Sequence, residues 1–276
     1  MQSHSAGDSL KKVAAGLGAV GLLVVKLGAK LKFVIAPLLK FFPFILKTGG
    51  TMLLSIGLYA QWWGWKFAVG FVLLILVHEF GHMIAARKLG LNTSWPMFIP
   101  FMGAFIALKD APRNAWVEAW VGISGPLLGS LGALVCHSAG EMLGIPLLIG
   151  LAWSAYWLNL FNLTPVGQLD GGHVATALSP WLWVPGIGIL GWMAWQHPNF
   201  IILMLLFLAI PRLISLFRKR TEAEQRFYEV TPQQRWAMAA IYFGLIAALV
   251  FGMDVCEKEL QGRGARDRSE QVASVK

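Results

Sequence analysis

Charged residues are scarce in this chain. Asp, Glu, Lys and Arg together make up 13% of its 276 residues, whereas hydrophobic residues make up 57%. A soluble domain carries roughly 25% charged residues. The shortage of charge excludes an ordinary soluble globular protein, and the sequence predicts an all-α polytopic membrane protein instead.

Acidic residues are scarcer than basic ones. The chain has 14 Asp and Glu against 23 Lys and Arg, which gives a formal net charge of +9. A basic excess can indicate a nucleic-acid-binding protein, but here the Lys and Arg residues stand at the ends of apolar segments. Membrane proteins show this pattern because positive charge is retained on the inner side of the bilayer. We therefore expect the lipid bilayer as a partner, and no nucleic acid.

Cysteine is nearly absent. The two cysteines, Cys136 and Cys256, form no C-x-x-C motif and are too few for a disulfide framework. The simplest interpretation is two unpaired thiols. Long polar stretches are missing too, since no loop reaches the roughly 50 residues that a soluble domain needs.

Apolar segments of nearly spanning length fill most of the chain. We expect about six to eight transmembrane helices, because a span needs roughly 20 apolar residues. A segment near 95–108, broken by two prolines and a glycine, reads as a re-entrant hairpin. The expected spans lie near 49–63, 66–86, 115–138, 144–162, 178–195, 199–217 and 235–253.

The same pattern divides the chain into four parts. Residues 1–47 are apolar but dotted with lysines, which favours an amphipathic, membrane-associated segment. Residues 48–217 form the membrane-embedded core that would carry any catalysis, and residues 218–253 form a cytosolic loop and the last span. Residues 254–276 are polar and short, so we expect a disordered tail.

Basic loop residues predict the orientation of the spans. Arg87 and Lys88, Lys109 and Arg113, and the cluster at 212–220 all fall on one side if the spans alternate. We assign that side to the cytosol. The prediction is a multi-pass protein of the cell membrane, with its active site toward the cytosolic side.

One polar cluster interrupts the apolar run at 67–77. The string His78-Glu79-Phe80-Gly81-His82 follows that run directly. Polar groups at membrane depth are costly in free energy, so their presence indicates a functional site. Residues i and i+4 share one helix face, so His78 and His82 can bind one Zn²⁺ ion, while Glu79 can act as a general base on a metal-activated water. We expect Gly81 to leave room for a substrate backbone beside the metal.

A catalytic zinc ion also needs a third protein ligand. Asp170 is the best candidate in an apolar context, although its position before Gly171 and Gly172 equally suits a helix N-cap. His173 follows three residues later and could be a partner of a ligand or an alternative ligand, but such a residue is more often a polar group satisfied by its own hydrogen bonds.

Two motifs resemble those of a known family. The string H-E-F-G-H at 78–82 and the string N-L-T-P-V-G-Q-L-D-G at 162–171 are similar to the two signatures of the site-2 protease family of intramembrane zinc metalloproteases. The resemblance implies that His78, His82 and Asp170 bind zinc and that Glu79 is the catalytic base. It also implies that Asn162 lies near the substrate or stabilises the oxyanion.

The resemblance predicts a metalloendopeptidase that cleaves transmembrane or signal-anchor segments of other membrane proteins in regulated intramembrane proteolysis. One alternative is an HExxH membrane peptidase of the prenyl-protein protease type, which would take a glutamate ligand such as Glu118 or Glu141. Another is a catalytically silent protein that binds client helices. The sequence leaves open whether two copies form a homodimer.

Overall fold

The computed structural model describes residues 49–274, with side chains described as far as Gly264. The expected amphipathic segment at 1–47 therefore lies outside the described residues. The chain divides into two units, Met1–Thr51 and Met52–Lys276. The description below concerns the second unit.

The first half of this unit contains two helices, a small sheet and a third helix. Helix α2 (Gly50–Trp63) is separated from α3 (Trp65–Lys88) by Gly64, whose φ of 75° breaks the helix. Strands β1 (Met97–Ile99) and β2 (Gly103–Phe105) pair in antiparallel register. Helix α4 (Ala115–Leu143) begins after Asn114, whose side chain accepts a hydrogen bond from the backbone N–H of Val117.

The second half is helical. It consists of α5 (Pro146–Asn162), α6 (Asp170–Leu178), the short 3-10 helix η1 (Pro180–Leu182), α7 (Trp183–Gln196), α8 (Phe200–Ser215), α9 (Glu222–Phe227) and α10 (Pro232–Ser274). Pro146 opens α5 at a position where its missing N–H costs nothing. Non-helical backbone joins α5 to α6 at 163–169.

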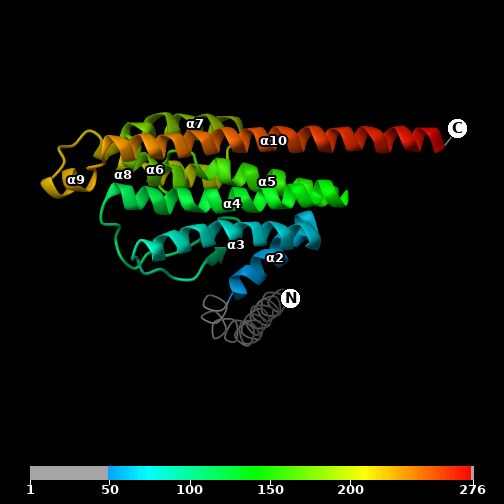
Figure 1. Cartoon of the computed structure of the whole chain (residues 1–276), viewed down its shortest axis with the longest axis horizontal. Helices are drawn as coiled ribbons and strands as arrows, with labels where there is room; N and C mark the ends of the chain where they lie inside the picture. The colour runs from blue at the N-terminus through cyan, green and yellow to red at the C-terminus, as the bar shows by residue number, and fades with distance from the viewer. Residues whose placement is uncertain (1–48, 275–276) are drawn as a thin grey trace, which may run out of the picture. The chain divides into compact units, whose positions relative to one another are not determined.

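Helix α4 is the centre of the packing. It contacts α3, α5 and α6, and α10 packs against α5, α4 and α6 (Figure 1). The main core forms where α4, α5, α6 and α10 meet, and its fully buried members include Ile123, Ile149, Val174, Met238 and Leu249. This arrangement surrounds the start of α6 with helices on several sides.

Three helices among the described residues are long and apolar enough to cross a membrane: α3, α4 and α10 over Pro232–Gly264. Helix α8 is apolar but shorter. Large apolar side chains are exposed on these helices, among them Leu131, Val135, Phe207, Trp236 and Phe251. Exposed apolar surface of this extent indicates an integral membrane protein.

The hairpin is closed at its base by a carboxylate. Asp110 accepts hydrogen bonds of 2.8 Å from the backbone N–H and from the side-chain amide of Asn92. These bonds hold the pKa of Asp110 below its usual value, because they favour the ionised carboxylate. A short sheet therefore occupies the segment in which we expected a hairpin, and all other named elements among residues 49–274 are helices.

Two other regions differ from expectation. The span expected at 178–195 is shorter, because α6 ends at Leu178 and α7 begins only at Trp183, after the 3-10 helix η1. The tail expected to be disordered from residue 254 instead continues α10 as helix to Ser274. Composition alone suggested disorder, but Lys258 pairs with Asp254 one turn away and Cys256 is fully buried against the core.

Candidate metal centre

Two histidines of α3 and one aspartate of α6 converge on a single point. The Nε2 atoms of His78 and His82 lie 3.0 Å apart. The carboxylate of Asp170 places Oδ2 3.2 Å from Nε2 of His78 and Oδ1 3.2 Å from Nε2 of His82. All three side chains are largely buried, with 4%, 9% and 15% of their surface exposed.

The outer nitrogen of each histidine ring has a fixed partner. Nδ1 of His82 lies 2.7 Å from the backbone oxygen of Val121, which can only accept, so Nδ1 carries the proton. Nδ1 of His78 lies 2.7 Å from Oδ1 of Asn159, whose amide nitrogen donates to the Ala155 oxygen. With the proton on Nδ1, each ring in its neutral form would direct the lone pair of Nε2 toward the shared point.

This arrangement fits a cation. Two lone-pair nitrogens and a carboxylate face one another, and Oδ2 of Asp170 is buried without a hydrogen-bond partner among the described residues. Such acceptors repel one another unless a positive charge lies between them. Tetrahedral zinc ligands with bonds of about 2.0 Å stand about 3.3 Å apart, which matches the separations of 3.0 and 3.2 Å between the acceptors.

Glu79 lies beside this point but is not one of the three side chains that converge on it. It is 5% exposed and groups with His78 and His82 as a possible metal-binding cluster. Its carboxylate accepts a hydrogen bond from the backbone N–H of Ile106, directly after β2. The hairpin therefore helps to position the residue that we expect to act as the base.

Glycines of α4 provide the space in which the site is built. A Cβ atom on Gly125 would lie 2.1 Å from Nε2 of His82, and one on Gly129 would lie 2.4 Å from Oδ1 of Asn159. Gly81 has a different role from the one expected. The space next to it is filled by α4, because its Cβ would lie 2.2 Å from the oxygen of Ser124. Gly81 therefore allows α3 and α4 to touch and leaves no room for substrate.

The structure distinguishes the two interpretations of Asp170. The N-cap of α6 is Leu169, and no side chain caps this helix end. Asp170 is the first helical residue, and its carboxylate points to the histidines rather than to free backbone N–H groups. Its position therefore suits a metal ligand.

The remaining candidates lie away from the converging atoms. Nδ1 of His173 is 2.7 Å from Oε1 of Glu118, which also pairs with Arg212 at 3.4 Å. Glu141 groups with His137 in another part of the chain. Neither glutamate is placed as the third ligand that a prenyl-protein protease arrangement would require.

Asn162 ends α5 and is half-buried. Its side chain has no hydrogen-bond partner in the part of the chain for which side chains are described, so its amide can donate to a bound peptide. The backbone that follows is tied within the protein, because the Leu163 oxygen accepts from Tyr242 and Gly172 packs on the Val166 oxygen.

Sequence reasoning missed Asn159. This residue is 1% exposed and orients His78, yet it matches neither motif. The signal was present, because an amide inside an apolar segment is costly and must find a partner. Asn159 stands one helical turn before Asn162 in the same apolar segment, so its polarity alone marks it as a candidate functional residue.

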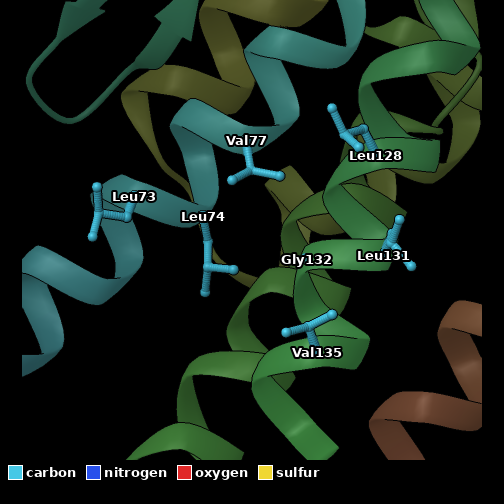
Figure 2. Close-up of a pocket in the computed structure, with 7 residues that line it drawn as sticks. All are labelled: Leu73, Leu74, Val77, Leu128, Leu131, Gly132 and Val135. Atoms are coloured by element: carbon cyan, nitrogen blue, oxygen red, sulfur yellow. The ribbon is translucent and has the colours of Figure 1, made fainter. Parts of the chain in front are cut away.

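An apolar groove lies between α3 and α4 next to the site. Figure 2 shows three side chains of α3 on one side, including Val77, which precedes the candidate ligand His78. The groove has a volume of about 320 Å³ and is lined by Leu73, Leu74, Val77, Leu128, Leu131, Gly132 and Val135. The surface of α3 is therefore apolar as far as the residue before His78.

Comparisons with known proteins agree with this geometry. Residues 66–144 match the model of Peptidase family M50. The chain is 31% identical over 131 residues to zinc metalloprotease MJ0392 of Methanocaldococcus jannaschii, which covers 45% of this chain and 37% of that protein. It is 25% identical over 229 residues to a probable chloroplastic zinc metalloprotease, EGY2, of Oryza sativa subsp. indica, which covers 64% of this chain and 41% of that protein.

The chain thus spans about two fifths of the length of these curated relatives. The residues that match the family model, 66–144, include the helix with both histidines and the helix whose glycines make room for them. Over residues 66–144 the chain is thus similar to peptidase family M50, the site-2 protease family, and the relatives it matches are named zinc metalloproteases or probable zinc metalloproteases.

Proposed function

We propose that this protein is an intramembrane zinc metalloendopeptidase that cleaves transmembrane or signal-anchor segments of other membrane proteins. One observation carries the proposal. His78, His82 and Asp170 converge on one point between apolar helices of spanning length, with Glu79 beside them. A metalloprotease site among helices of this kind suits a substrate that lies in the same bilayer.

The residues divide the chemistry among them. His78, His82 and Asp170 would hold a zinc ion, which polarises the scissile carbonyl and lowers the pKa of the attacking water. Glu79 takes a proton from that water and delivers it to the leaving nitrogen. Asn162 donates its free amide hydrogen to the oxyanion. In other enzymes, removal of one such donor costs roughly 3–4 kcal/mol.

The substrate helix must unwind before cleavage. Its backbone carbonyls are hydrogen-bonded within the helix and shielded by side chains, so the reacting peptide bond has to be extended. The antiparallel hairpin next to Glu79 supports this step, because a strand edge can pair with an extended peptide. Regulated proteolysis of single-span proteins is the function that we infer.

The membrane arrangement is part of the same proposal. We propose about six to eight transmembrane helices in the cell membrane, with the basic end of α3 at the cytosolic face. The zinc-binding histidines then lie on the order of 10 Å from that face, at 1.5 Å per residue. Water reaches the site from the cytosol, and cleavage falls toward the cytosolic side.

The test compares the membrane proteomes of cells that express the wild-type protein or Glu79→Gln. We expect uncut single-span proteins to accumulate in the variant, while the purified variant keeps the zinc content of the wild type. Glu222→Gln is the matched control, because Glu222 is an exposed acid of α9. The proposal fails if the purified protein binds no zinc, or if Glu79→Gln retains zinc and leaves cleavage unchanged.

A further inference from the structure

A second cluster of possible ligands lies toward the other end of α4. His137 and Glu141 stand one turn apart on α4, and Glu259 approaches them from α10. Nε2 of His137 is 3.3 Å from Oε1 of Glu259, and one ligand atom from each of the three residues lies within 4.8 Å of the others. Among the described residues, only this group and the His78 group have such geometry.

This cluster is partly buried: His137 and one oxygen of Glu259 are buried, whereas Glu141 is exposed and the Glu259 side chain is 24% exposed. The side chain of His137 is 9% exposed, and its ring packs edge-on against Tyr156. The second oxygen of Glu259, Oε2, is buried and has no hydrogen-bond partner in the described part of the chain. Two carboxylates from different helices also face each other here, and like charges at short range repel unless a cation lies between them.

We propose that His137, Glu141 and Glu259 form a second divalent-cation site. One imidazole nitrogen and two carboxylate oxygens suit zinc, which binds both ligand types in proteins. The site would join α4 to α10 and so hold α10 against the bundle. This function is separate from peptide-bond cleavage, because it needs no open coordination position and no base.

The two cation sites are far apart. Val121, whose oxygen orients the catalytic His82, precedes His137 by 16 residues on α4. At 1.5 Å per residue this is roughly 24 Å along the helix axis. Loss of one site therefore leaves the ligands of the other untouched, which allows the two to be counted separately.

The test counts zinc ions per chain by mass spectrometry of the purified full-length protein in detergent. We expect two ions for the wild type, one for Glu141→Gln, one for His82→Ala, and none for the double variant. Glu141 is exposed, so its replacement does not disturb the packing. Glu257→Gln is the control, because it removes an exposed charge from the same helix as Glu259 and should retain two ions.

A thermal measurement supports the count. Zinc added to the His82→Ala protein should raise its melting temperature, and Glu141→Gln in that background should abolish the rise. Equal zinc content in the wild type and Glu141→Gln would overturn the proposal, and would indicate that Glu141 and Glu259 share a proton instead. A wild-type protein that holds only one ion, and a His82→Ala variant that holds none, would overturn it equally.

Discussion

Gly125→Ala should displace a metal ligand although position 125 contributes no ligand itself. The new Cβ atom would lie 2.1 Å from Nε2 and 2.3 Å from Cε1 of His82. Non-bonded carbon atoms approach to about 3.5 Å. The imidazole must therefore move by more than about 1 Å relative to α4.

Neither way of moving preserves the site. If the ring turns, Nδ1 of His82 loses the Val121 oxygen that fixes its orientation. If α3 moves away from α4, the pair of histidines moves away from Asp170. Metal–ligand distances tolerate only about 0.2 Å, and loss of an orienting partner alone costs 10–100-fold in affinity. We expect zinc affinity to fall by on the order of 100-fold, about 2.7 kcal/mol.

The assay is competitive zinc titration of the purified protein in detergent, with circular dichroism as a check that the helices are intact. Gly132→Ala is the matched control. It adds the same methyl group to the same helix, but its Cβ meets only side-chain atoms, of Val77 at 3.1 Å and of Leu74 at 3.6 Å, and these side chains can adjust. If Gly125→Ala binds zinc at the catalytic site as tightly as Gly132→Ala does, the geometric reasoning is wrong.

Three further substitutions test other parts of the structure. Asn159→Ala removes the partner of His78 and should lower zinc affinity 10–100-fold in titrations, whereas Asn159→Asp keeps an acceptor and should lose less. Tyr242→Phe removes the hydrogen bond to the Leu163 oxygen and should lower the free energy of unfolding by about 1 kcal/mol in denaturant titrations. Folding lowers the pKa of Asp110 below its usual 3.8. Its contribution to hairpin stability is therefore present above that pH and lost as the pH falls through the lower folded value. Hydrogen exchange should show the hairpin opening in acid, and in Asp110→Ala already at neutral pH.

Local patterns predicted the part of the site that one helix builds. The spacing of His78 and His82 places both on the same face of any α-helix, so their approach needs no tertiary information. Asp170 belongs to a different helix. It is the first residue of α6 and follows Lys88, the last residue of α3, by 82 residues. Its placement depends on how α6 packs against α4, and residue spacing alone therefore left the N-cap interpretation open.

The second cluster shows the opposite case. His137 and Glu141 have the spacing of a possible ligand pair, but histidine followed by glutamate one turn later is a weak pattern in one sequence. Glu259 lies in the segment that composition assigned to a disordered tail. Only the continuation of α10 as a helix brings it to α4, and this packing cannot be read from polarity.

Helix α4 controls the catalytic geometry without supplying a ligand. Its backbone oxygen at Val121 orients one histidine, its bare backbone at Gly125 makes room for the same ring, and Gly129 makes room for the amide that orients the other. Each contact tolerates a shift of only a fraction of an ångström in the position of α4 relative to α3 and α5. Added volume on this face should therefore impair zinc binding more than added volume on its lipid-exposed face, where Leu131 and Val135 have free space.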